Sequence, residues 1–303
     1  MKTIYIKNRQ FPTVSEPLCA AIGNFDGVHL GHQKLIEECK RHGYKSAVLT
    51  FYPHPSVFLK KIPDYPLITP LKKKEDILSR MGIDYLIIIE FTEAVMTMSK
   101  EEFIACIKAM HIVSCVCGYD FTFGRKAEGT IEDLRREFEF YEVKKYVYED
   151  VRVSSTYIRE LLQAGDVEKA GRLLGRIYSI RGEVISGSKQ GRLIGFPTAN
   201  LCYGRYFLPH GGVYFVKVVI DQIEYYGMAN IGNNPTFNYS EEKKLEVHIF
   251  GLNQEIYGQQ IEVFFLKRIR SESRFSSKEE LIAQLKKDKE ECFLLSKEMN
   301  YTK

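Results

Sequence analysis

The chain has 303 residues, of which 45% are hydrophobic and 27% charged, a balance typical of a globular protein of about two domains. Its net charge of +4 is small beside the basic excess of most nucleic-acid-binding proteins, so we expect anionic small molecules and no nucleic acid as partners. No apolar run reaches the roughly 18 residues of a membrane span and the N-terminus lacks a signal-peptide pattern, which predicts a cytoplasmic protein without membrane contacts.

The first half of the chain alternates short apolar runs with amphipathic stretches. The runs predict strands at residues 18–22, 46–51, 84–89, 112–117 and 143–147, and the stretches predict helices near 32–41, 71–80 and 101–110. Strands that alternate with helices indicate an α/β fold with a doubly wound parallel sheet. Ligands bind at the carboxyl ends of the strands in such sheets, which directs attention to the loop after residues 18–22.

Two smaller features of this half have simple structural interpretations. Seven cysteines are present and none forms a Cys-x-x-Cys pair. Cys115 and Cys117 would share one face of a strand and pack there as small hydrophobic residues. The basic run Lys72-Lys73-Lys74 is interpreted as a solvated helix face.

The strongest motif is Gly23-Asn24-Phe25-Asp26-Gly27-Val28-His29-Leu30-Gly31-His32. Imidazoles and free N–H groups at the opening of a helix favour an anion, and a glycine lets phosphate approach the backbone. Either histidine alone could equally cap the helix or pack in the core. The string resembles the His-x-Gly-His signature of nucleotidylyltransferases, which direct attack on the α-phosphate of ATP. That resemblance implies catalytic roles for His29 and His32, and ATP-binding roles for Asn24, Phe25, Asp26 and Gly31.

A second motif, Val153-Ser154-Ser155-Thr156-Tyr157-Ile158-Arg159, places three hydroxyls at a helix start and a guanidinium one turn later. Ser154 or Ser155 could serve as a helix N-cap. The hydroxyls and the guanidinium could also clamp a triphosphate. The segment resembles Ser-Ser-Thr-x-Ile-Arg of the same superfamily, which implies ATP binding by Ser154, Ser155 and Thr156 and a catalytic role for Arg159.

Two further segments, 50–55 and 118–124, resemble those that hold the flavin in bacterial FAD synthetases. The resemblance implies flavin binding by five residues of these segments: His54, Pro55, Asp120, Phe121 and Phe123. Aromatic side chains could pack against an isoalloxazine ring. Read without the resemblance, the same segments would be a strand end and an aromatic core.

The pattern changes near residue 178. Short β-rich runs separated by Gly, Pro and Asn clusters continue to about residue 268 and predict a small antiparallel β-barrel. Helical periodicity from 277 to about 299 predicts a C-terminal helix, which Ser276 and Ser277 would start. We place the domain boundary after a helix at 167–174, giving domains 1–176 and 177–303.

The barrel half carries the string 186–201, with three closely spaced glycines followed by Pro197-Thr198-Ala199-Asn200. A glycine loop with added positive charge can wrap phosphates, although turns between strands need glycines too. Pro-Thr-Ala-Asn resembles the signature of riboflavin kinases. The resemblance implies that Thr198 and Asn200 hold Mg²⁺ beside ATP, and that the loop residues bind ATP: Gly187, Lys189, Gly191, Arg192 and Gly195.

The segment Leu245-Glu246-Val247-His248 resembles the strand that carries the catalytic base of riboflavin kinases. The resemblance implies that Glu246 accepts the proton of the riboflavin 5′-hydroxyl, while a solvated glutamate on the outer barrel face is the simpler alternative. His248 shares the face of Glu246 because side chains alternate along a strand.

Together the motifs resemble the bacterial bifunctional riboflavin kinase/FMN adenylyltransferase (FAD synthetase) family along most of the chain. The resemblance implies phosphorylation of riboflavin to FMN and adenylylation of FMN to FAD, with ATP as co-substrate and Mg²⁺ as cofactor. One alternative is an FMN adenylyltransferase whose barrel binds flavin without chemistry. Another is a His-x-Gly-His enzyme for a different nucleotide or for tRNA charging, which leaves the barrel motifs unexplained. The sequence leaves a homo-oligomer open.

Overall fold

The structure, a computed structural model, describes residues 1–187, 190–233 and 243–301. Packing divides the chain into two compact units, Met1–Tyr157 and Ile158–Lys303. Most of α7 (Ser155–Ala164) and all of α8 (Val167–Leu174) therefore belong with the second unit, where α8 contacts β14 (Gln260–Arg270). The division of activities at residue 176 concerns function and stays a prediction.

The first unit is built on a six-stranded parallel sheet with the strand order β1-β4-β3-β2-β5-β6. Its strands are β1 (Lys2–Ile6), β2 (Leu18–Ile22), β3 (Lys45–Tyr52), β4 (Tyr85–Glu90), β5 (Ile112–Gly118) and β6 (Glu139–Val143). Along β2, Ala20 and Ile22 enter one hydrophobic core while Cys19 and Ala21 enter another. Both faces of the sheet are therefore buried, which confirms the doubly wound parallel sheet.

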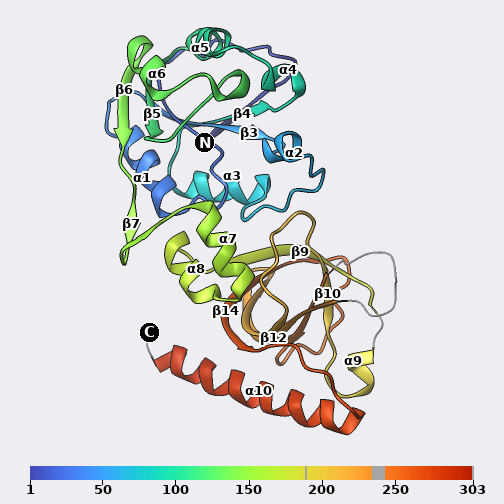
Figure 1. Cartoon of the computed structure of the whole chain (residues 1–303). Helices are drawn as coiled ribbons and strands as arrows, with labels where there is room; N and C mark the ends of the chain where they lie inside the picture. The colour runs from blue at the N-terminus through green and yellow to red at the C-terminus, as the bar shows by residue number, and fades with distance from the viewer. Residues whose placement is uncertain (188–189, 234–242, 302–303) are drawn as a thin grey trace. The chain divides into compact units, whose positions relative to one another are not determined.

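Helices cover the two faces as Figure 1 shows, with α1 (Leu30–Cys39) and α3 (Leu71–Arg80) on one side and α5 (Lys100–Ala109) and α6 (Ile131–Glu137) on the other. The remaining elements of the unit are short: α2 (Ser56–Leu59), α4 (Glu93–Met96), a 3₁₀ turn (Arg125–Ala127) and the hairpin strands β7 (Val147–Tyr148) and β8 (Val151–Arg152). Cys115 and Cys117 lie in the same core as free thiols, as expected for small hydrophobic residues.

Two strands of the parallel sheet differ from the sequence prediction. The prediction of a strand at residues 143–147 is wrong. The strand is β6 at Glu139–Val143, which pairs in parallel with Ser114–Gly118 of β5. β1 was not predicted, and it pairs in parallel with β4 at the edge of the sheet. Both are edge strands with half-exposed side chains, so their apolar alternation is weak.

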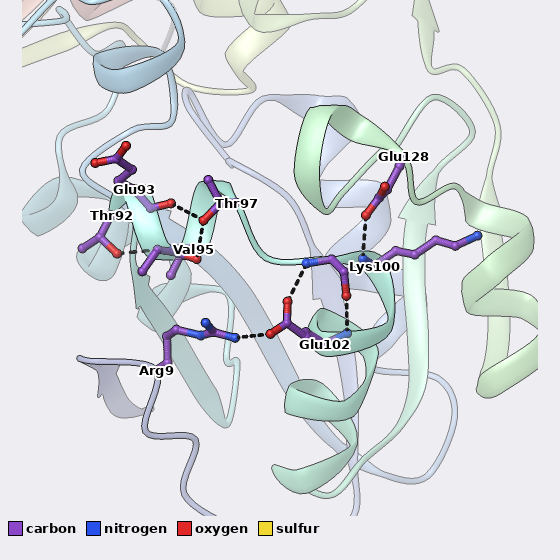
Figure 2. Close-up of polar contacts among 10 residues, drawn as sticks. Arg9, Thr92, Glu93, Val95, Thr97, Lys100, Glu102 and Glu128 are labelled. Carbon is purple, nitrogen blue, oxygen red and sulfur yellow. Dashed lines mark hydrogen bonds and ion pairs between the residues drawn. The ribbon is translucent and has the colours of Figure 1, made fainter.

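The N-terminus of α5 is held by the polar contacts in Figure 2. Ser99 and Glu102 form a capping box, in which the Ser99 hydroxyl accepts the Glu102 N–H at 3.1 Å and the Glu102 carboxylate accepts the Ser99 N–H at 2.8 Å. Glu102 also pairs with Arg9 at 2.9 Å, and Glu128 accepts the Lys100 N–H at 3.2 Å. These contacts fix the segment after β1 and the segment after residues 118–124 to one helix end.

The second unit is a closed antiparallel barrel with the strand order β10-β13-β12-β11-β14-β9, which confirms the predicted barrel. Besides β14 it contains β9 (Ser179–Ile185), β10 (Ala199–Cys202), β11 (Gly212–Ile220), β12 (Ile223–Asn233) and β13 (Lys243–Ile249), with α9 (Gln190–Leu193) between β9 and β10. Along β13, Leu245 and Val247 are buried while Glu246 between them is half-exposed. Glu246 therefore points to the opposite side of the barrel wall from its apolar neighbours.

The predicted C-terminal helix is α10 (Lys278–Tyr301), and the Ser277 hydroxyl accepts the Glu280 N–H at 3.1 Å as its cap. Cys292 is fully buried in a cluster with Phe215 and Met228 of the barrel. Asp288, also buried, accepts bonds from Arg270 of β14 at 2.8 and 3.0 Å. An ion pair and an apolar seam thus join the helix to the barrel. No helix in the described part of the chain is long and apolar enough to cross a membrane.

Candidate functional sites at the sheet edge and the barrel wall

The turn of residues 23–29 leaves the carboxyl end of β2 at the point where the strand order reverses. β3 lies on one side of β2 and β5 on the other, the place where doubly wound sheets bind ligands. Phe25 and Val28 have φ angles of 49° and 40°, and both side chains are fully buried in the core. Packing therefore holds the turn in a conformation that these residues seldom adopt.

His29 and His32 lie together at the start of α1. The Nδ1 atom of His29 accepts the backbone N–H of His32 at 3.2 Å, and the two rings stack with centroids 3.6 Å apart. Because Nδ1 is the acceptor, the proton of neutral His29 is on Nε2. A methyl group on Gly31 would lie 3.2 Å from His29 Nδ1, so the glycine leaves room for the ring. A helix N-terminus beside two imidazoles is an arrangement that can bind an anion, so the anion site stays a prediction.

Asp26 bonds within the protein through its carboxylate, and Asn24 does so through its backbone carbonyl. The buried Asp26 carboxylate accepts the backbone N–H of Thr69 at 3.0 Å and that of Ile68 at 3.4 Å. The Asn24 carbonyl accepts bonds from Thr50 Oγ1 at 3.0 Å. These contacts support the shape of the turn, while direct ATP contacts by Asn24, Phe25 and Asp26 stay predictions.

Lys74 is buried, although the sequence predicted a solvated side chain at this position. It belongs to the basic run expected to be solvated, yet it is only 6% exposed, so that interpretation is wrong for this residue. Its ammonium group donates to the Asn24 carbonyl at 2.7 Å. Burial lowers the pKa of Lys74 to about 8, and the charge of Asp26 opposes that shift. The burial of Lys74 was not predicted because the sequence does not show which of three consecutive lysines faces the protein interior.

The segment 153–159 meets the turn through Ser155, whose hydroxyl donates to the Asp26 carbonyl at 2.7 Å. The Ser154 hydroxyl accepts the Tyr157 N–H at 3.2 Å and so caps α7, while Thr156 is exposed. Arg159 is grouped with the second unit, where its guanidinium lies 5.0 Å from the centre of the Phe207 ring. The structure thus brings Ser155 to the turn and gives Arg159 an aromatic neighbour.

The predicted flavin segments follow the carboxyl ends of β3 and β5. The His54 ring stacks on Tyr65 with centroids 4.9 Å apart, and its Nδ1 accepts the Ser56 N–H at 3.1 Å. Pro55 is buried at the start of α2.

The second flavin segment has both core and surface residues. Phe121 and Phe123 stack with centroids 5.9 Å apart, and Phe123 is the buried member of the pair. Asp120 is exposed and forms an ion pair with Arg152. Phe121 is therefore the more accessible of the two aromatic rings.

Three oxygen-bearing side chains, Thr198, Asn200 and Glu246, form what we call the oxygen cluster. Asn200 of β10 lies directly opposite Glu246 of β13, and Asn230 of β12 lies opposite Glu246 on its other side. Directly opposed residues share a face with their Cβ atoms about 5 Å apart. Thr198 lies two residues before Asn200, just outside β10, and a methyl group on Gly191 would lie 3.5 Å from its Oγ1. No functional role was predicted for Asn230 from the sequence.

The glycine loop packs against this cluster. A methyl group on Gly187 would lie 2.1 Å from Asn200 Nδ2, and one on Gly191 would lie 2.3 Å from the Phe196 carbonyl oxygen. Gly195 has a φ of 82°, which favours glycine. Arg192 forms an exposed ion pair with Glu255 at 3.0 Å. Lys189, also predicted to bind ATP, lies outside the described residues.

His248 contacts the backbone of the Pro197–Asn200 segment. Its Nδ1 lies 2.8 Å from the carbonyl oxygen of Pro197, and its ring meets Phe196 and Phe250 edge to face. Burial lowers the pKa of His248, and the bond to Pro197 opposes this shift. A neutral buried ring bonded to the backbone is suited to holding Pro197 and the residues that follow it.

Comparisons with known proteins match two successive parts of the chain to two family models. Residues 12–157 match the family model described as FAD synthetase, and residues 174–294 match that described as riboflavin kinase. The bifunctional riboflavin kinase/FMN adenylyltransferase of Bacillus subtilis (strain 168) is 42% identical over 96% of this chain and 97% of its own length. The enzyme of that name from Escherichia coli (strain K12) is 34% identical over 88% of this chain and 89% of its own.

A crystal structure described as a macrolide-efflux protein from Streptococcus pneumoniae has a TM-score of 0.88 and 37% identity, with 96% of this chain and 98% of that chain covered. That description belongs to that protein, and its likeness confirms the fold of both units. Two family models and relatives aligned over nearly the full length lead to one conclusion. The chain belongs to the bifunctional riboflavin kinase/FMN adenylyltransferase family.

Proposed function

We propose that this chain makes FAD from riboflavin at two sites, with adenylyl transfer at the turn of residues 23–29 and α1, and phosphorylation at the oxygen cluster. One observation carries the second assignment most directly. A carboxylate, Glu246, lies opposite the amide of Asn200. Gly187 packs so closely against that amide that any side chain at position 187 would clash with it. A barrel that only bound flavin would need neither a base nor a pair of oxygen ligands. This argues against the monofunctional alternative.

In the kinase step, Glu246 accepts the proton of the riboflavin 5′-hydroxyl as its oxygen bonds to the γ-phosphorus of ATP and ADP leaves. The donor set of the cluster fits Mg²⁺, because hydroxyl and amide oxygens are ligands that this hard cation accepts. Thr198 and Asn200 would hold the ion, which when bound neutralises phosphate charge. The glycine loop, with Gly187, Gly191 and Gly195 and the cations Lys189 and Arg192, would enclose the phosphates.

In the adenylyl step, a phosphate oxygen of FMN bonds to the α-phosphorus of ATP and pyrophosphate leaves. The attacking phosphate is already an anion, so the protein must stabilise charge more than remove a proton. His29 and His32 offer imidazole N–H groups at the positive end of α1. Ser154, Ser155, Thr156 and Arg159 would contact the polyphosphate. His54, Pro55, Asp120, Phe121 and Phe123 would position the flavin.

The remaining parts of the proposal come from the sequence. We assign adenylyl transfer to residues 1–176 and phosphorylation to 177–303, with riboflavin, FMN and ATP as partners and no nucleic acid or membrane. All seven cysteines are free thiols, as is usual in a reducing compartment, which supports a cytoplasmic location. A homo-oligomer is left open.

The proposal is tested by incubating the purified protein with riboflavin, ATP and Mg²⁺ and resolving riboflavin, FMN and FAD by chromatography. We expect FMN to form first and FAD to follow, and both reactions to stop when the metal is chelated. Formation of FAD from added FMN, with riboflavin left untouched, would favour the adenylyltransferase with a non-catalytic barrel.

A further inference from the structure

Lys74 is a buried cation directly beneath the predicted nucleotide site. Its side chain runs from α3 toward the carboxyl end of β3, where Nζ donates to the Asn24 carbonyl at 2.7 Å and lies 3.3 Å from Thr50 Oγ1. The Thr50 hydroxyl, itself fully buried, bonds to the same carbonyl at 3.0 Å. Two donors from two different elements therefore converge on one backbone oxygen at the start of the turn.

The position does not require a lysine for packing. Burial of an ammonium group is costly, and an apolar side chain would fill the same space without that cost. The neighbouring Lys72 shows the usual alternative, because its side chain is 80% exposed and only 3.8 Å from Glu75. A buried cation at Lys74 thus calls for a role that an apolar residue could not perform.

The surroundings of the ammonium group indicate that role. Beyond Asn24 the chain passes through Phe25, Gly27 and Val28, all with φ angles in the left-handed region, and then reaches the first histidine. A bond from a charged donor to a carbonyl is roughly twice as strong as a neutral one. Asp26 is the charged group that faces Lys74 from the turn. The ammonium group thus holds the turn through the Asn24 carbonyl. Its positive charge also balances the Asp26 carboxylate, which would otherwise repel an anionic substrate.

We propose that Lys74 is a positioning residue for adenylyl transfer, whose charged side chain holds the turn of residues 23–29 so that His29 and His32 meet the polyphosphate. The inference rests on the proposed assignment of this turn to adenylyl transfer. Lys74 contacts the backbone of the turn and acts through the histidines.

The charge of Lys74 gives this role a pH signature. Since burial lowers its pKa to about 8, the ammonium is present below that pH in the folded protein and is lost as the pH rises through it. Above that pH the donor to Asn24 is neutral and Asp26 is no longer offset. FMN adenylylation should therefore weaken as the pH rises through about 8, while riboflavin phosphorylation in the second unit should not share this change.

The test compares full-length Lys74→Met with wild type and with the matched control Lys72→Met, with both activities measured from below to above pH 8. Methionine replaces most of the apolar stem, lacks the terminal ammonium, and leaves the Asn24 carbonyl bonded to Thr50. We expect adenylylation kcat to fall on the order of 10²-fold, the scale of a misplaced catalytic group. Phosphorylation and the control should be unchanged. We also expect the remaining adenylylation of Lys74→Met to lack the decline that wild type shows above pH 8.

Unchanged adenylylation in Lys74→Met, or the same decline above pH 8 in both proteins, would overturn the inference. His32→Ala measured in parallel separates the two proposals. If His32→Ala is impaired and Lys74→Met is not, only the role of Lys74 fails. Full activity of His32→Ala would overturn both. If Lys74→Met does not fold, Lys74→Arg decides the matter, because arginine stays charged at every pH used and should remove the decline.

Discussion

Gly187 provides the most direct structural test of the kinase site. Its φ lies outside the left-handed region, so alanine brings no backbone strain and only space is at issue. The new methyl carbon would lie 2.1 Å from Asn200 Nδ2, whereas ordinary contact begins at 3.4 Å. The amide or the loop must therefore move by at least about 1.3 Å. A displacement of about 1 Å in a catalytic group can cost on the order of 10²-fold in rate.

We therefore expect Gly187→Ala to lower kcat for riboflavin phosphorylation on the order of 10²-fold and to leave FMN adenylylation intact. Steady-state rates with each flavin substrate measure the two effects separately. The matched control is Gly171→Ala in α8, where a methyl group would lie 3.4 Å from the Arg176 carbonyl oxygen and helix propensity favours alanine. Normal phosphorylation by Gly187→Ala would refute the reasoning, because Asn200 would then not need its present position.

Three further substitutions address the two sites and the barrel. His29→Ala should lower adenylyl transfer on the order of 10²-fold or more, the scale of losing a charge stabiliser, with phosphorylation unchanged; an equal fall in both rates would show that the sites are coupled. Glu246→Gln keeps the shape and removes the base, so phosphorylation should fall on the order of 10²–10⁴-fold. A loss of only a few-fold would make Glu246 a residue that orients the hydroxyl. Asp288→Ala leaves Arg270 without its buried partner and should lower the free energy of unfolding by about 3 kcal/mol in urea titrations, whereas a negligible loss would show that the apolar seam alone holds α10.

The elements that the sequence predicted well are those with a clear apolar pattern. The helices at 71–80 and 167–174 have the same bounds in the structure, as does the strand at 18–22. Their apolar patterns are complete because each packs against the sheet or the barrel. The edge strands β1 and β6 were missed or misplaced, since an edge strand needs fewer apolar residues.

The site residues divide in a similar way. The sequence placed the motifs correctly at the ends of β2, β3 and β5, where parallel strands open their carboxyl ends together. It could not show the contacts between motifs. Ser155 meets Asp26, and Lys74 meets Asn24, across many residues of chain. Such contacts depend on how helices pack on the sheet, and no local pattern of residue types encodes them.

The central claim is that one chain carries two independent activities at the assigned residues. Complementation tests it most directly, with riboflavin, ATP and Mg²⁺ supplied to Glu246→Gln, to His32→Ala and to an equal mixture of the two. We predict that Glu246→Gln leaves riboflavin but converts added FMN, that His32→Ala accumulates FMN, and that the mixture makes FAD. Loss of both activities in either folded variant, or a mixture that makes no FAD, would contradict the claim.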